Sequence, residues 1–191
     1  MITQSGSAPD VIKKVKKESW LTEDEGTFLA LLMRIQPATA YQLSKAYALS
    51  PVSKFGTSKG KIYPIIDRLE GRGLLTKSRV GGDSRGTERL ECTALGREAV
   101  REWAMDIRPA HLLLDDPLRT RVQSFDLLSK EEQIEWIIRS RLGLRAKLEE
   151  LETYASTVEV PFQNIVHDNA VMSVHTRLEW LDRLLASIAG P

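Results

Sequence analysis

The sequence predicts a mostly α-helical protein that carries one small β-hairpin. Three observations support this fold class. Capped segments repeat apolar residues at helical spacing in both halves of the chain. A glycine-rich turn at residues 81–86 separates two short segments of strand character. Apolar residues near the C-terminus are spaced alternately three and four apart, which is typical of helices that pack side by side.

The composition is that of a water-soluble protein. The chain of 191 residues is long enough for one good core or for two small domains. It has no apolar run near the roughly 18 residues of a membrane helix and no signal-peptide pattern at its start. Its only cysteine, Cys92, cannot form a disulfide within the chain. We therefore expect a cytoplasmic protein without membrane contact.

Charge is distributed unevenly, although the net charge is only +1. Residues 1–95 hold 15 Lys and Arg against 10 Asp and Glu, whereas residues 96–191 hold 12 against 16. A phosphate backbone attracts a basic segment and repels an acidic one. The two halves are therefore expected to have different functions, with any nucleic-acid contact in the first.

Two helices are predicted at the start of the basic half. The first begins at Thr22, because Thr22-x-x-Glu25 is a capping box in which each side chain satisfies a free backbone N–H group. Pro37 stops this helix. Thr39 caps the second helix, which extends to about Ala48.

A third helix is predicted over residues 59–71, with Ser58 as its N-cap. Pro64 lies inside it and predicts a local distortion, because proline removes a backbone hydrogen bond and crowds the preceding turn. The apolar face of this helix consists of Ile62, Ile65, Ile66 and Leu69.

A β-hairpin is predicted next. Residues 74–80 form its first strand, and residues 88–92 alternate polar and apolar side chains like a half-buried return strand. Three helices followed by such a hairpin is the order of a winged helix-turn-helix, whose third helix enters the major groove of double-stranded DNA. The sequence therefore predicts DNA binding by this half of the chain.

Helices continue through the acidic half. Thr93 caps a fourth helix, and Asp116-Pro117 opens a short fifth one. Ser129-x-x-Glu132 is a second capping box, and it opens a long helix that ends near Ala155. The inward face of this long helix is predicted to include Ile134, Ile138, Leu142, Leu144, Leu148 and Leu151.

The last predicted helix, residues 166–188, carries the apolar seam of alternating spacing. Every position of the seam is apolar, so it must face another helix, either in the same chain or in the partner of a dimer. The candidate interface residues are Val171, Val174, Leu178, Leu181, Leu185 and Ile188.

The candidate DNA-binding residues are polar, basic or hydroxyl-bearing side chains of the second helix, the third helix and the hairpin. Lys and Arg donate to guanine edges or to phosphates, and a Tyr hydroxyl donates to a phosphate. Any one of them could instead be an ordinary surface residue. The set is Tyr41, Gln42, Lys45, Ser58, Lys59, Lys61, Tyr63, Arg68, Arg79, Ser84 and Arg85.

Residues 21–103 resemble the PadR family of bacterial transcription regulators, and the C-terminal half resembles the long helical domain of one PadR subfamily. The most specific feature is Tyr63-Pro64 followed by Arg68-Leu69-Glu70, which accounts for the proline inside a helix. The other matching segments are Ala30-Leu31-Leu32, Ala40-Tyr41-Gln42-Leu43, Gly60-Lys61-Ile62, Gly73-Leu74-Leu75, Thr93-Ala94-Leu95-Gly96-Arg97-Glu98 and Leu178-Glu179-Trp180-Leu181.

The chain also departs from the family pattern. Lys61 stands where the family often has Ser or Thr, and Thr39-Ala40 replaces the usual His-Gly. Polar residues around Thr87–Arg89 replace the aromatic pair of the wing.

The resemblance implies a dimeric repressor that binds an inverted-repeat operator and is released by a small aromatic acid, of the phenolic or vanillate-like type. It implies a winged helix-turn-helix at 20–107 and a helical domain for dimerisation and effector binding at 108–191. The lysine cluster at residues 13–17 predicts that residues 1–19 are either a basic arm that touches DNA or a solvated tail. The candidate effector-binding residues, which could equally be core or interface residues, are Trp103, His111, Trp136 and Trp180.

Two other functions are the alternatives to a DNA-binding regulator. An enzyme is not expected: the three histidines are too dispersed for a familiar metal spacing, and no glycine-rich phosphate loop is present, so no catalytic residue, metal or cofactor is predicted. The other alternative is a winged-helix module that forms dimers or binds proteins without binding DNA. The basic side chains of the third helix and hairpin favour the DNA-binding regulator over this module, because a module that does not bind DNA has no need of them.

Overall fold

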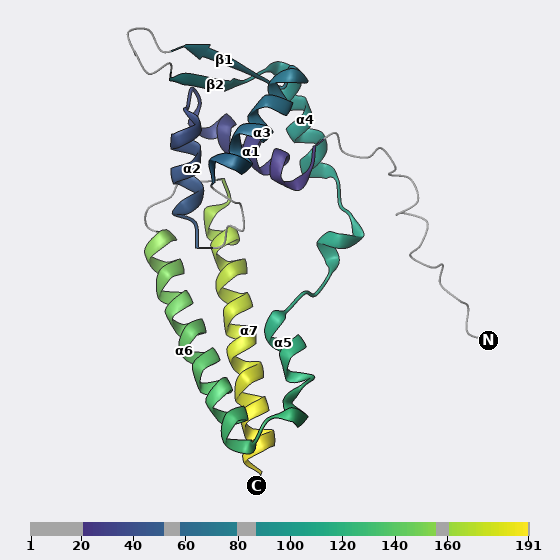
Figure 1. Cartoon of the computed structure of the whole chain (residues 1–191), viewed down its shortest axis with the longest axis vertical. Helices are drawn as coiled ribbons and strands as arrows, with labels where there is room; N and C mark the ends of the chain where they lie inside the picture. Colours follow the sequence, from purple (N-terminus) through teal and green to yellow (C-terminus); the bar gives the residue numbers. More distant parts are fainter. Residues whose placement is uncertain (1–20, 52–57, 80–86, 156–160, 191) are drawn as a thin grey trace, which may run out of the picture. The chain divides into compact units, whose positions relative to one another are not determined.

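The computed structural model describes residues 21–51, 58–79, 87–155 and 161–190 (Figure 1). The predicted basic arm at 1–19 and the wing residues Ser84 and Arg85 lie outside them. The chain forms two compact units. The first contains residues 1–44 and 56–111, and the second contains residues 45–55 and 112–191.

The predicted fold class is confirmed: the described residues are mostly helical and carry one two-stranded antiparallel sheet. The elements that begin in the first unit are α1 (Glu23–Ile35), α2 (Ala40–Ala48), α3 (Lys59–Gly71), β1 (Leu75–Arg79), β2 (Glu88–Cys92), α4 (Ala94–Met105) and a 3-10 turn (Pro109–Leu112). The second unit adds α5 (Pro117–Val122), a 3-10 turn (Phe125–Leu127), α6 (Lys130–Ala155) and α7 (Gln163–Ala189).

The two predicted capping boxes are present. The Thr22 Oγ1 accepts a hydrogen bond from the Glu25 N–H, and the Glu25 carboxylate accepts one from the Thr22 N–H, both at 3.2 Å. Ser129 and Glu132 make the same reciprocal pair at the start of α6. Each cap satisfies N–H groups that the first turn of a helix leaves free.

Helix α3 continues through Pro64 without a break, so the expected distortion does not interrupt it. Ile62 and Ile65 are buried on either side of this proline and hold the helix against the core. Ser58 occupies the N-cap position, but its side chain makes no capping hydrogen bond.

The hairpin is joined by a third stretch of backbone. β1 pairs with β2 in antiparallel register, from Leu75 opposite Cys92 to Arg79 opposite Glu88. The segment that follows α1 adds an isolated bridge, in which the Ala38 and Leu90 backbones exchange hydrogen bonds of 3.2 and 2.8 Å. This bridge connects the helical part of the first unit to its hairpin.

The core of the first unit lies between α1, α3, α4 and the hairpin. Helix α4 packs closely on α1, because a Cβ atom added to Gly26 would lie 2.3 Å from the Trp103 ring. The largest fully buried side chains of this core are Leu21, Phe28, Leu29, Leu32, Leu43, Ile66, Leu69, Leu74, Leu75 and Leu90.

In the second unit α6 and α7 run alongside each other as an antiparallel pair (Figure 1). Ile137 and Leu181 are fully buried where these helices meet, together with Phe125. Ile138 and Leu142, which were expected to face inward, are exposed instead. Leu151 is buried and Ile134, Leu144 and Leu148 are half-buried, so the predicted inward face is wrong at Ile138 and Leu142 only.

The C-terminal seam packs within one chain. Val174 is buried, Leu181 is fully buried, and Leu185 and Ile188 pack against the same cluster. This arrangement matches the first of the two alternatives left open by the spacing. The surface that Val174 and Leu181 would need for a dimer contact is already covered, and Val171 and Leu178 are half-buried.

Candidate nucleic-acid interface

The exposed side of α3 carries most of the predicted DNA-binding residues. Lys61, Tyr63 and Arg68 are exposed, while the four isoleucine and leucine residues of the opposite side are buried. Ser58 is also exposed, just before the helix. Lys59 opens α3, but its side chain lies outside the described part of the structure. The sequence thus forms a helix whose apolar side fixes its position and whose basic side faces solvent.

Helix α2 presents Tyr41, Gln42 and Lys45 on its exposed surface. The Gln42 side chain is partly engaged, because its Oε1 accepts a hydrogen bond of 2.8 Å from the Thr39 N–H. The Thr39 Oγ1 accepts one of 3.2 Å from the Gln42 N–H in return. This second type of capping box, Thr-x-x-Gln, is visible in the sequence but did not enter the prediction. The side-chain NH₂ group of Gln42 is left to donate to another partner.

The described part of the hairpin presents Arg79 at the end of β1, where it is exposed and opposite Glu88. Arg89 is exposed on the return strand, between the exposed Glu88 and the buried Leu90.

Arg68 makes an ion pair that the sequence did not reveal. Its Nε atom donates to the Glu25 Oε1 at 2.9 Å, and the Arg72 Nη1 donates to the Glu25 Oε2 at 3.1 Å. Glu25 belongs to α1 and is only 3% exposed, although the sequence pattern identified it solely as a cap. One buried carboxylate therefore holds two arginines of α3.

The surroundings of Glu25 favour its charged form. Burial raises the pKa of its carboxyl group, but this effect is outweighed by the hydrogen bonds from Arg68 and the Thr22 backbone and by the charges of Arg72 and Arg68. The net result is a pKa below the ordinary value. The ion pair is thus present at neutral pH.

Lys77 of β1 makes a second ion network with α3. Its Nζ atom lies 2.8 Å from the Asp67 Oδ1 and 2.7 Å from the Glu70 Oε2. Hydrogen bonds to Asp67 and Glu70 raise the pKa of Lys77, so it remains charged. Lys77 thereby offsets the two acidic charges of α3, which would otherwise repel a phosphate backbone.

The structure places the predicted effector-binding residues in two groups. Trp103 packs on α1 at Gly26, and the His111 Nε2 lies 3.0 Å from the Glu23 Oε1, both in the first unit. Trp136 packs edge-on against Phe125, and Trp180 packs on the same cluster in the second unit. These contacts give each tryptophan a packing role.

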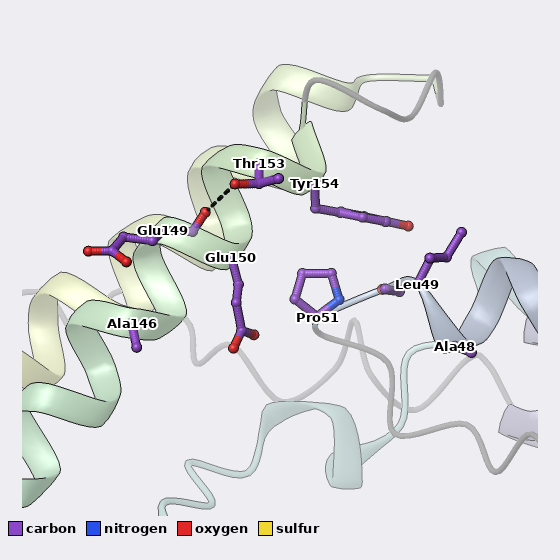
Figure 2. Close-up of a pocket in the computed structure, with 9 residues that line it drawn as sticks. Ala48, Leu49, Pro51, Ala146, Glu149, Glu150, Thr153 and Tyr154 are labelled. Carbon is purple, nitrogen blue, oxygen red and sulfur yellow. Dashed lines mark hydrogen bonds between the residues drawn. The ribbon is translucent and has the colours of Figure 1, made fainter.

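A pocket of about 670 Å³ lies in the second unit, where the end of α2 and the residues after it meet α6. Figure 2 shows Glu150 and Tyr154 extending from α6 toward Pro51. The four predicted effector-binding residues do not line this pocket. Two carboxylates do, Glu149 and Glu150, of which Glu150 pairs with Lys147. An aromatic acid would meet unfavourable charge here.

The described residues contain no cluster of three or more His, Cys, Asp and Glu side chains that could hold a metal ion. None of their helices is long and apolar enough to cross a membrane.

Comparison with known proteins identifies the fold. No protein-family model and no curated protein sequence matches the chain. Among solved structures, the chain is similar to Bacillus subtilis PadR in complex with operator DNA, with a TM-score of 0.73, 19% identity, and coverage of 86% of this chain and 98% of that one. The same regulator in complex with p-coumaric acid gives a TM-score of 0.71 and 18% identity, with coverage of 87% and 98%.

A PadR-like transcriptional regulator from Bacillus cereus is also similar, with a TM-score of 0.68, 19% identity, and coverage of 96% of this chain and 99% of that one. The chain therefore has the fold of the PadR regulators over nearly its whole length.

Proposed function

We propose that this chain is a sequence-specific DNA-binding transcriptional regulator of the PadR family, with α3 as its recognition helix. The observation that carries the proposal is the exposed basic side of α3, with Lys61 and Arg68, held on a buried apolar face within a winged helix. The similarity to a PadR solved with operator DNA supports the same use of the fold.

In this proposal α3 enters the major groove, which is about 12 Å wide. Lys61 and Arg68 donate to base edges or phosphates, and Tyr63 donates its hydroxyl to a phosphate. Helix α2 lies across the backbone with Tyr41 and Lys45, while Ser58 and Lys59 approach the backbone at the start of α3. The wing, with Arg79, Ser84 and Arg85, contacts an adjacent groove or phosphate row.

The regulator acts as a homodimer on an inverted repeat, because two symmetric subunits present two recognition helices to two half-sites. Of the predicted interface residues, Val174 and Leu181 are covered within the chain, whereas Val171, Leu178, Leu185 and Ile188 are half-buried and stay candidates for the contact. Ile138 and Leu142 lie one turn apart on the exposed side of α6 and form an apolar stripe that a second copy would cover. We assign the dimer contact to this stripe.

A small effector completes the proposal, and repression is the expected mode of regulation. An effector changes DNA affinity only if it binds one conformation of the dimer more tightly than the other. The solved complex of a PadR with p-coumaric acid supports an aromatic acid as the first compound to test. Trp103, His111, Trp136 and Trp180 remain the proposed contacts, since the acidic pocket beside α6 disfavours an anion.

The first experiment selects duplexes that the purified protein binds from random genomic fragments, and then measures their affinity for wild type and for the Lys61→Ala/Arg68→Ala variant. Loss of binding with an unchanged circular dichroism spectrum supports α3 as the recognition helix. Arg101→Ala is the matched control, because Arg101 is an exposed arginine of α4. A wild-type protein that binds no fragment would favour the module that forms dimers or binds proteins without DNA.

The effector is tested separately by titrating aromatic acids into the protein–duplex complex while tryptophan fluorescence and DNA release are followed. Release by one acid supports the proposal. A panel of phenolic and benzoic acids without any response removes the aromatic-acid effector and leaves DNA binding untouched.

A further inference from the structure

We infer that Glu25 is a positioning residue for DNA binding: it orients the Arg68 guanidinium so that its terminal nitrogens meet a phosphate of the DNA backbone. The inference rests on the proposed function, because it assumes that α3 contacts DNA. It assigns to a buried carboxylate of α1 a role in an interface that this carboxylate does not touch.

Only one edge of the Arg68 guanidinium is engaged by Glu25. Glu25 accepts a hydrogen bond from the Arg68 Nε at 2.9 Å. Within the described part of the chain, the two Nη atoms of Arg68 make no contact of their own, and its side chain is 53% exposed. The inner edge of the guanidinium is thus fixed, while its outer nitrogens stay available. A guanidinium has enough donors to bind a carboxylate and a phosphate at the same time.

The Glu25 carboxylate is held in a fixed position. It also accepts hydrogen bonds from the Thr22 N–H and from the Arg72 Nη1, and the Glu25 N–H is capped by the Thr22 Oγ1. A long exposed arginine loses much side-chain freedom when it binds. Contact with a fixed carboxylate removes part of this freedom before DNA arrives, and such preorganisation increases affinity.

The distribution of charge on α3 also favours a phosphate at Arg68. The Glu25 carboxylate faces two arginines of α3, Arg68 and Arg72. The positive charge of Arg68 lies on the side of α3 that faces α1, whereas the acidic Asp67 and Glu70 are paired with Lys77 of the hairpin. The favourable location for a phosphate is therefore beside Arg68.

The test is a double-mutant cycle on Glu25 and Arg68, read as affinity for a duplex selected by the wild-type protein. Arg68→Ala should weaken binding by about tenfold to a hundredfold, as expected for a charge-assisted hydrogen bond. It should also reduce the slope of log affinity against log salt by about 0.9. Glu25→Gln should weaken binding several-fold in wild type and cause no further loss in Arg68→Ala.

The sign of the Glu25→Gln effect is decisive. Removal of a negative charge near DNA should by itself strengthen binding, so weaker binding requires loss of orientation. Unchanged or tighter binding by Glu25→Gln, or equal losses with and without Arg68, would overturn the inference. Arg68→Lys gives a second test that leaves Glu25 intact. Because a lysine ammonium lacks the two-sided fork, its affinity should fall to near that of Arg68→Ala, and wild-type affinity would contradict the inference.

Two controls separate orientation from folding. Thr22→Ala weakens the same helix start but keeps the backbone hydrogen bond to the Glu25 carboxylate, so it should bind DNA like wild type. Glu98→Gln removes a carboxylate from an exposed arginine of α4 and should also leave affinity unchanged. If Thr22→Ala reproduces the Glu25→Gln loss, the effect is one of stability and the inference fails. Failure of the wild-type protein to bind any duplex is a different outcome and contradicts the proposed function.

Discussion

The ammonium group of Lys77 lies 2.7 Å from the carboxylate of Glu70, and this ion pair ties the first strand of the hairpin to α3. Asp67 accepts from the same ammonium group at 2.8 Å. Glu25 holds α3 from α1 through Arg68. Because the two networks hold different sides of α3, they fix its rotation about its own axis and therefore which residues it presents.

Replacement of Lys77 by Met tests this arrangement. We expect the free energy of unfolding to fall by no more than about 1 kcal/mol, since the side chains of Asp67 and Glu70 are 66% and 42% exposed. DNA affinity should fall more clearly, because two carboxylates near the phosphates lose their counter-charge. Glu70→Gln in the same chain should restore part of the affinity. Lys147→Met, which breaks an ion pair of α6, is the control, and equal losses in both variants would argue against a role for Lys77 in DNA binding.

Gly60, which has open space around it, provides a test of whether the outer side of α3 contacts DNA. A Cβ atom at Gly60 would meet nothing within 4 Å, so Gly60→Ala should not destabilise the fold and should favour the helix by up to about 1 kcal/mol. If α3 enters a groove with this side, the added methyl group should weaken DNA binding. Gly143→Ala on α6 has the same open surroundings and should leave DNA affinity unchanged. Unaltered binding by both variants would place the DNA on another surface.

The ion pair of Glu25 predicts a particular pH dependence of stability. The pKa of Glu25 is lowered in the folded state, so its carboxylate adds stability that is present above its ordinary value of 4.5 and is lost as pH falls through the lower folded value. Wild type should therefore exceed Glu25→Gln in free energy of unfolding at neutral pH, and the difference should shrink below about pH 4.5. Urea unfolding of both proteins across this range measures it. A difference that does not change with pH would show that the two variants differ by packing alone.

Cys92 provides a direct measure of how well the first unit is packed. It is 6% exposed, and burial raises the pKa of its thiol, while the charge of Arg97 offsets only part of this effect. The native protein should thus react slowly with iodoacetamide near neutral pH, because the thiolate is the reactive form. As the only cysteine of the chain, it should be labelled completely in urea. Rapid labelling of native protein would contradict the buried position and renew interest in a nucleophilic role.

Local patterns in the sequence were sufficient for the helix starts and for the buried side of α3. The capping boxes depend on residues three positions apart, and the buried face of α3 depends on one helical period, so both are readable without a tertiary structure. The partners of Glu25 and Lys77 were not predictable in this way. Glu25 and Arg68 are 43 residues apart, and only the packing of α1 on α3 brings them together.

The C-terminal seam shows that spacing alone does not identify which helix a seam packs against. Its spacing requires a facing helix but is the same whether that helix belongs to the same chain or to a partner. In the structure α6 occupies that position, and Leu181 is fully buried against it. On α6, Ile138 was predicted to face inward in place of the buried Ile137, because the two residues are adjacent and equally apolar and periodicity alone did not separate them.

The exposed stripe on α6 gives the last prediction, which concerns the dimer. Leu142 is 60% exposed in the single chain, so Leu142→Glu should leave the folded subunit intact while placing a charge in the proposed contact. We expect sedimentation to show a shift toward monomer and affinity for an inverted repeat to fall, whereas circular dichroism stays unchanged. Leu181→Ala is the contrasting variant: it should destabilise the subunit by about 2–5 kcal/mol, because it leaves a cavity in the core. A Leu142→Glu protein that remains dimeric would assign the contact to a different surface of the chain.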